Sequence, residues 1–249
     1  MPPCSGKGWS KIEMANLSQA ERARYVQGMF GRIAHRYDLM NRLMTAGQDV
    51  RWRREVIRRA SLPSQARLLD LGAGTGDLAL ETIRQIPGAS PVAADFTLAM
   101  MRVGQARLRA MACRGPAWCG ADALNLPFPA NQFDAVVSGF LMRNVGNLLQ
   151  ALKEQRRVLK PGGRIVILDT TPLQGRLLSP LIAIHLNFII PNLGRLLTGH
   201  PEAYTYLPHS TRQFLTAEAL AERMLECGYL RVGFHRLMFG SVAIHWGVK

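Results

Sequence analysis

The chain has 249 residues and 48% of them are apolar, which suits a single folded domain with a sizeable core and excludes an intrinsically disordered chain. Its formal net charge is +14 at pH 7, and half of that excess lies in residues 1–60. This charge fits a nucleic-acid partner, an anionic membrane surface or a basic solvated face. The four cysteines form no CxxC pair and show no zinc spacing with histidines, so we predict reduced cytosolic cysteines and no metal site.

The N-terminal part is predicted to be helical after a short tail. Residues 1–15 are expected to be a flexible tail, and because they contain no apolar run no signal peptide is predicted. Residues 18–60 carry apolar side chains at helical spacing, and Pro63 ends that block. We assign residues 16–62 to an N-terminal helical lid.

The remainder, residues 63–249, is predicted to be an α/β core. Strands are expected at 67–71, 91–94, 134–138, 164–168, 229–235 and 241–246. Helices are expected at 78–85, 98–111, 148–159 and 217–227, with a turn at 160–163. Strands that alternate with helices favour a mostly parallel, doubly wound, Rossmann-like sheet.

The most apolar stretch is residues 177–197. Pro180 and Pro191 interrupt it, and the segment between them is well below the ~20 residues that span a bilayer. We therefore expect a buried or surface-lying helix, and we assign residues 172–212 to a substrate-side insertion in the core.

A glycine-rich turn follows the first predicted strand. Gly72, Gly74 and Gly76 give the pattern G-x-G-x-G, whereas a dinucleotide fingerprint would place its third glycine at Asp77. Aspartates on both sides of the turn disfavour a pyrophosphate and suit a ligand that carries a sulfonium and an ammonium group. The pattern favours S-adenosylmethionine as cofactor. The residues assigned to it here are Asp70, Gly72, Gly74, Thr75 and Gly76.

Further cofactor contacts are predicted at the ends of later strands. Asp95 ends the second strand, where a carboxylate accepts hydrogen bonds from ribose hydroxyls. Asp122 lies on a loop where it can accept the adenine amino proton between apolar neighbours. The predicted cofactor-binding residues after the glycine turn are Asp95, Phe96, Asp122, Ala123, Ser138 and Gly139. Together these features predict a class I methyltransferase.

Several longer motifs resemble the ubiquinone/menaquinone biosynthesis C-methyltransferase family, from about residue 25 to the C-terminus. The resemblance is carried by residues 30–41 (FGRIAHRYDLMN), 142–145 (MRNV), 157–164 (RVLKPGGR), 204–208 (YTYLP) and 243–249 (AIHWGVK). The chain departs from the family pattern at Thr45, Gln48, Asp49, Asp169 and His209, and around Ser138. None of these departures touches the glycine turn.

The resemblance implies an S-adenosylmethionine-dependent methylation of the ring of a prenylated quinol, with demethylmenaquinol favoured over the ubiquinone precursor. It assigns catalysis to Arg143, Asn144 and Tyr37, the first two holding the quinol oxygen. It assigns substrate binding to Asp38, Asn41, Tyr204, Tyr206 and His209. A cytoplasmic enzyme that rests on the inner face of the membrane is expected, and a homodimer is compatible with the sequence.

Three alternatives remain open. A methyltransferase of another small aromatic substrate would share the glycine turn but not the motif at residues 37–41. An RNA methyltransferase would suit the positive charge, although the chain has no added RNA-binding module and no N-P-P-Y-type motif, so no nucleic-acid partner is predicted. A non-enzymatic cofactor-binding protein would have no need of Arg143 and Asn144.

Overall fold

A computed structural model describes residues 19–112, 115–172, 206 and 209–249. The predicted tail at 1–15, most of the insertion at 172–212 and the predicted substrate residue Tyr204 lie outside the described residues.

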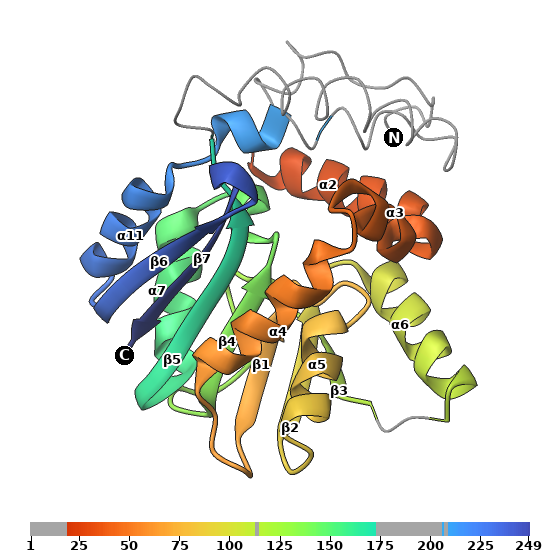
Figure 1. Cartoon of the computed structure of the whole chain (residues 1–249), viewed down its shortest axis with the longest axis horizontal. Coiled ribbons are helices and arrows are strands. Elements are labelled where there is room, and N and C mark those ends of the chain that lie inside the picture. The colour runs from red at the N-terminus through yellow and green to blue at the C-terminus, as the bar shows by residue number, and fades with distance from the viewer. Residues whose placement is uncertain (1–18, 113–114, 173–205, 207–208) are drawn as a thin grey trace.

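Seven strands form one sheet in the order β3-β2-β1-β4-β5-β7-β6 (Figure 1). The parallel strands are β1 (Arg67–Leu71), β2 (Ser90–Asp95), β3 (Ala117–Gly120), β4 (Phe133–Gly139) and β5 (Leu159–Thr170). The strand β7 (Val242–Val248) pairs antiparallel with both β5 and β6 (Leu230–Leu237). The predicted mostly parallel Rossmann-like sheet is confirmed. Strand order reverses between β1 and β4, and open α/β sheets bind ligands beyond the carboxyl ends of strands at such a point.

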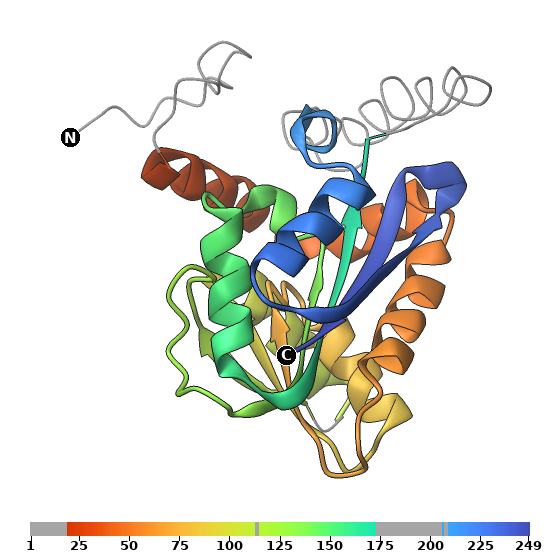
Figure 2. The same ribbon diagram turned by 90° about the vertical axis from the view of Figure 1, so that its left-hand side faces the viewer.

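Helices cover both faces of the sheet (Figure 2). On one face lie α4 (Gln48–Ala60) and α5 (Asp77–Gln85), and on the other lie α7 (Leu148–Val158) and α11 (Ala217–Glu226). Successive residues of β1 point to opposite faces, so Leu68 is buried under α4 and α5 and Leu69 under α7 and α11. This two-sided burial explains why the central strands β1 and β4 are mostly apolar.

The helix α6 (Leu98–Ala110) packs against β2. Its Gly104 has no side chain where the helix meets the glycine turn, and a Cβ there would lie 2.5 Å from the Thr75 carbonyl oxygen. This close approach brings the middle of α6 to the turn that follows β1.

The N-terminal helices lie across the carboxyl ends of the strands (Figure 1). They are α2 (Gln19–Ile33), a 3-10 turn at Ala34–Arg36, and α3 (Tyr37–Met44). Met29, Ile33, Met40 and Tyr206 form a separate apolar cluster beneath them. The helix α4 falls within the predicted lid at 16–62, yet it packs against β4, β5, β7 and α5. We therefore confine the predicted lid to α2, the 3-10 turn and α3, and the word lid names residues 19–44 below.

Two details of the predicted elements differ from the structure. The strand β3 was not predicted. Residues 160–163 do not form a turn between helix and strand; they belong to β5, whose pairing with β4 shifts between Phe133 and Ala135. Gly162, at φ +76°, supplies the left-handed backbone of this irregularity, which explains a turn-like sequence inside a strand.

Candidate functional site

The turn after β1 depends on glycine at three positions. Gly72, Gly74 and Gly76 have φ of +68°, +57° and +84°, values that disfavour residues with a side chain. A Cβ at Gly76 would also lie 2.7 Å from Cη2 of the Trp118 ring. The amides of Gly72 and Ala73 donate to the Ala94 carbonyl oxygen at 2.8 and 3.0 Å, so the turn folds back against the end of β2.

Asp95 joins the turn to the next loop. Its Oδ2 accepts a hydrogen bond from the Gly74 amide at 2.7 Å, and its Oδ1 accepts one from the Thr97 amide at 2.6 Å. Burial raises the pKa of this carboxyl, although its backbone hydrogen bonds oppose the change. The sequence prediction placed Asp95 at a strand end, and the structure shows it holding the turn and facing a cavity.

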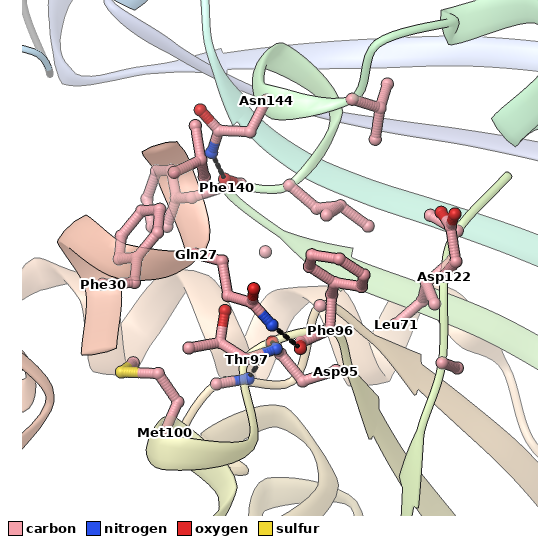
Figure 3. Close-up of a pocket in the computed structure, with 18 of the residues that line it drawn as sticks. Gln27, Phe30, Leu71, Asp95, Phe96, Thr97, Met100, Asp122, Phe140 and Asn144 are labelled. Atoms are coloured by element: carbon pink, nitrogen blue, oxygen red, sulfur yellow. Dashed lines mark hydrogen bonds between the residues drawn. The ribbon is translucent and has the colours of Figure 1, made fainter. Parts of the chain in front are cut away.

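That cavity has a volume of 390 Å³ and lies between the strand ends and the lid (Figure 3). It brings together nine of the predicted site residues: Tyr37, Gly72, Gly74, Asp95, Phe96, Asp122, Ala123, Gly139 and Asn144. Sequence reasoning missed other lining residues, including Gln27, Phe30, Thr97, Met100, Phe140 and Leu141. Gln27 Nε2 donates to the Phe96 carbonyl oxygen at 2.8 Å, so α2 is fixed to the rim of the cavity.

A smaller cavity of 30 Å³ adjoins the first, because both are lined by Tyr37, Gly72, Gly74, Gly139 and Phe140. Thr75 and Asp70 also line it. Oδ2 of Asp70 accepts a hydrogen bond from the Ala79 amide at 3.0 Å, whereas its buried Oδ1 has no hydrogen-bond partner among the described residues. Burial raises the pKa of Asp70 to about 7, and the negative charges of Asp95 and Asp77 act in the same direction.

These features fit S-adenosylmethionine. Glycines allow close approach of the backbone, and Asp95 presents a carboxylate for ribose hydroxyls. The unpartnered Oδ1 of Asp70 gives a cationic ammonium a place in the small cavity. Asp122 is exposed, and its Oδ1 accepts a hydrogen bond from the Leu124 amide at 2.9 Å, which shapes the loop predicted to hold the adenine.

Cofactor binding is expected to release a proton near pH 7. Asp70 is partly protonated there because burial raises its pKa, and a bound cation favours the carboxylate. Calorimetric titration with S-adenosylhomocysteine, in buffers of different ionisation enthalpy, measures the released proton. Asp70→Asn should abolish the release while the fold is kept. A wild-type binding heat that is independent of the buffer would contradict this role.

Arg143 lies beneath the cavity and does not line it. Its side chain is 4% exposed, and its Nη1 lies 2.5 Å from Oδ1 of Asp169, which is 1% exposed. The Arg143 amide also donates to Oδ2 of Asp169 at 3.2 Å, and Nε of Arg143 has no partner among the described residues. Ser138 is likewise fully buried and lines neither cavity.

The neighbouring Asn144 does line the large cavity. Its Nδ2 donates to the Phe140 carbonyl oxygen at 3.0 Å, and its Oδ1 accepts a hydrogen bond from the Tyr206 hydroxyl at 2.9 Å. Tyr206 is buried in the apolar cluster with Met29, Ile33 and Met40, and its hydroxyl fixes the Asn144 amide. His209 is half-buried and lines neither cavity.

The predicted residues of α3 separate into two groups. Tyr37 lines both cavities, and burial raises the pKa of its phenol. Asp38 and Asn41 line neither cavity. Asp38 instead contacts Thr75 and Arg107, a residue that sequence reasoning missed.

The described residues hold no cluster of metal-ligating side chains and no membrane-spanning helix. Among them, no group of three or more histidine, cysteine or acidic side chains has the arrangement of a metal site. None of the helices in this part of the chain is long and apolar enough to cross a bilayer.

Comparison with known proteins gives a consistent pattern. The model of the ubiE/COQ5 methyltransferase family matches residues 17–249. The ubiquinone/menaquinone biosynthesis C-methyltransferase UbiE of Desulfotalea psychrophila is 44% identical over 224 residues, which are 90% of this chain and 90% of that protein. The demethylmenaquinone methyltransferase of Thermus thermophilus is 42% identical and covers 88% of this chain and 99% of its own length.

Solved structures with the same fold are more distant in sequence. The [4+2]-cyclase SpnF has a TM-score of 0.67 and 16% identity, covering 91% of this chain and 96% of its own. An S-adenosylmethionine-dependent methyltransferase from Aquifex aeolicus has a TM-score of 0.55 and 16% identity, covering 79% and 88%. At such identities the likeness shows the fold alone.

Proposed function

The chain belongs to the ubiE/COQ5 methyltransferase family, and from this premise we propose that it methylates the ring of a prenylated quinol, converting demethylmenaquinol to menaquinol. It is a methyltransferase whose methyl donor is S-adenosylmethionine. The observation that carries the proposal is that Tyr37 of the lid and Asn144 line the same cavity as the glycine turn and Asp95. Donor and acceptor then meet in one cavity, so the transfer is a step within a single complex.

The cofactor supplies an activated methyl group on sulfur, so the protein has to orient the ring and favour the electron-rich form of the quinol. The Asn144 amide is fixed by Tyr206 and by the Phe140 carbonyl oxygen, and one of its two N–H donors remains for a quinol oxygen. Because burial raises the pKa of Tyr37, that residue stays a neutral phenol and also acts as a donor.

Arg143 is paired with Asp169, yet its charge still reaches the cavity: burial raises the pKa of the Tyr37 phenol and Arg143 opposes that rise. The same charge should favour the deprotonated quinol hydroxyl, which raises the electron density of the ring carbon. Of the described residues that line the large cavity, only Asp95 and Asp122 are carboxylates, and both lie on the side assigned to the nucleotide. Phe30 and Val26 of α2 line the cavity from the lid and help to exclude water from the transfer.

Complementation tests the proposal. Expression of this chain in a bacterium that lacks its quinone methyltransferase should restore menaquinone, and an Asn144→Leu variant should not. Mass analysis of the extracted lipids identifies the methylated quinone. Accumulation of the demethylated quinone despite normal expression, or methylation of RNA in its place, would reject the assigned substrate.

We also propose that α3 touches the membrane in which such a quinol resides. Leu39 and Leu43 are 52% and 43% exposed, and they lie one helical turn apart. Arg36, at the N-cap of α3, and Arg42, in its last turn, are also exposed. Apolar side chains with adjacent cations suit the interface of an anionic bilayer. The enzyme would then work at the cytoplasmic face of the membrane.

Vesicle flotation measures this contact. Wild-type protein should float with vesicles that contain phosphatidylglycerol, more strongly at low salt, because charge screening weakens the attraction. Leu39→Asn/Leu43→Asn should float several-fold less. The matched control, Leu225→Asn/Leu230→Asn, changes two exposed leucines far from the lid and should behave as wild type. Undiminished flotation of the α3 variant would contradict the assignment.

A further inference from the structure

Arg107 of α6 contacts three parts of the molecule at once. Its Nη1 lies 2.5 Å from Oδ2 of Asp38 on α3, and its Nη2 lies 2.8 Å from Oδ1 of Asp77 on α5. Nη2 also donates to the Thr75 carbonyl oxygen at 3.0 Å. A planar guanidinium can satisfy acceptors in several fixed directions, whereas an ammonium offers a single point charge.

A second bond completes this connection. The Thr75 hydroxyl donates to Oδ1 of Asp38 at 2.7 Å, so the lid helix is bonded to the glycine turn both directly and through Arg107. Tyr37, the residue before Asp38, lines the large cavity. The position of Asp38 therefore determines where the Tyr37 phenol lies relative to the cofactor turn.

We infer that Arg107 is a positioning residue that seats α3 on the glycine turn and thereby places Tyr37 in the cavity. The inference rests on the proposed function for the role of Tyr37 toward the acceptor. The seating of α3 depends only on contacts among α3, α5, α6 and the glycine turn. It can therefore be measured with S-adenosylhomocysteine bound and no acceptor present.

Charge explains why a cation is needed here. Asp38 and Asp77 are both half-buried and face the same guanidinium, with 26% and 17% of their side chains exposed. Burial and then the charge of Asp77 raise the pKa of Asp38, while Thr75, Arg107 and Arg53 of α4 lower it. Arg53, Arg107 and Arg42 lower the pKa of Asp77. Without Arg107, the carboxylates of Asp38 and Asp77 would repel each other, and only Arg53 and Arg42 would remain to offset their charges.

Removal of Arg107 should therefore make the seating depend on pH. In Arg107→Met, ionised Asp38 is repelled by Asp77, but protonated Asp38 can still accept the Thr75 hydroxyl bond. The lid should be displaced at high pH and return as the pH falls through the raised pKa of Asp38. An added Asp38→Asn change removes the repulsion and should make the double variant insensitive to pH.

The experiment is hydrogen exchange followed by mass spectrometry, with S-adenosylhomocysteine bound, at a series of pH values on both sides of the raised pKa of Asp38. Exchange rates are corrected for their intrinsic pH dependence. In Arg107→Met the peptide that spans α3 should exchange about tenfold faster at high pH than at low pH. Peptides from β4 should be unchanged. Arg109→Met, an exposed residue of the same helix, is the matched control and should resemble wild type.

Activity gives a second readout. Arg107→Met should lower kcat about tenfold at high pH with a smaller change in KM for the acceptor, and Arg107→Lys should recover part of it. Equal loss of protection in α3 and β4 at every pH would overturn the inference, as would an unchanged α3. Because exchange is measured without acceptor, failure of quinol methylation leaves this result intact.

Discussion

Replacing Asp95 with asparagine is expected to weaken the binding of S-adenosylhomocysteine about 100-fold, since hydrogen bonds to a charged group contribute about 1.5–3 kcal/mol each. The two carboxylate oxygens accept from the amides of Gly74 and Thr97. An amide has only one acceptor oxygen, so one of these bonds is lost and the ribose loses its charged partner. Isothermal titration calorimetry measures the dissociation constant.

The matched control is Glu218→Gln. Glu218 is an acidic residue of α11 that pairs with Arg236. It lines neither cavity, so its replacement should leave the dissociation constant unchanged. If Asp95→Asn bound the cofactor product as tightly as wild type, the nucleotide would have to bind elsewhere.

Breaking the pair between Arg143 and Asp169 is expected to lower the free energy of unfolding by about 3–5 kcal/mol, because it leaves a buried charge without its partner. Both side chains are nearly inaccessible to solvent. Arg143→Met leaves the buried Asp169 without a charged partner. A loss of activity in that variant alone could therefore come from lower stability or from the missing charge. Chemical denaturation measures the change.

The double variant Arg143→Met/Asp169→Leu separates the two roles. Removing both charges should restore part of the free energy of unfolding, since no unpaired buried charge remains, while the backbone amides of Arg143 and Thr170 lose their acceptor. Methyl transfer should stay low, because the positive charge that favours the deprotonated quinol is still missing. A double variant that regained wild-type activity would reduce Arg143 to a structural residue.

The local features of the site were predictable from the sequence. The glycine turn and Asp95 lie at or next to strand ends, and strands of this kind are marked by short apolar runs. The strand β3 was missed because Ala117–Gly120 has only four residues, ends in glycine and lies at the sheet edge, so it shows no clear alternation. The glycines of residues 160–163 indicated a turn, since nothing in the sequence reveals an irregular pairing with β4.

The contacts that hold the lid were not predictable. Gln27 and Phe96 are 69 residues apart, as are Asp38 and Arg107, and no periodic pattern links residues at that separation. The motif resemblance indicated that Asp38 was important and assigned it to the substrate. The structure adds a contact that the motif did not indicate: Asp38 accepts a hydrogen bond from Thr75 of the glycine turn. Sequence alone also gave no sign that Arg143 would be buried against Asp169.

Under the proposed function, one cavity joins the cofactor turn to the ring of a prenylated quinol. A single-turnover reaction tests it most directly, with purified enzyme, cofactor carrying a trideuterated methyl group, and demethylmenaquinol in detergent. Mass spectrometry should find one trideuterated methyl group on a ring carbon of the quinone, formed by wild type and strongly reduced in Asn144→Leu. Unlabelled quinone together with intact cofactor, under conditions where the cofactor is shown to bind, would contradict the account.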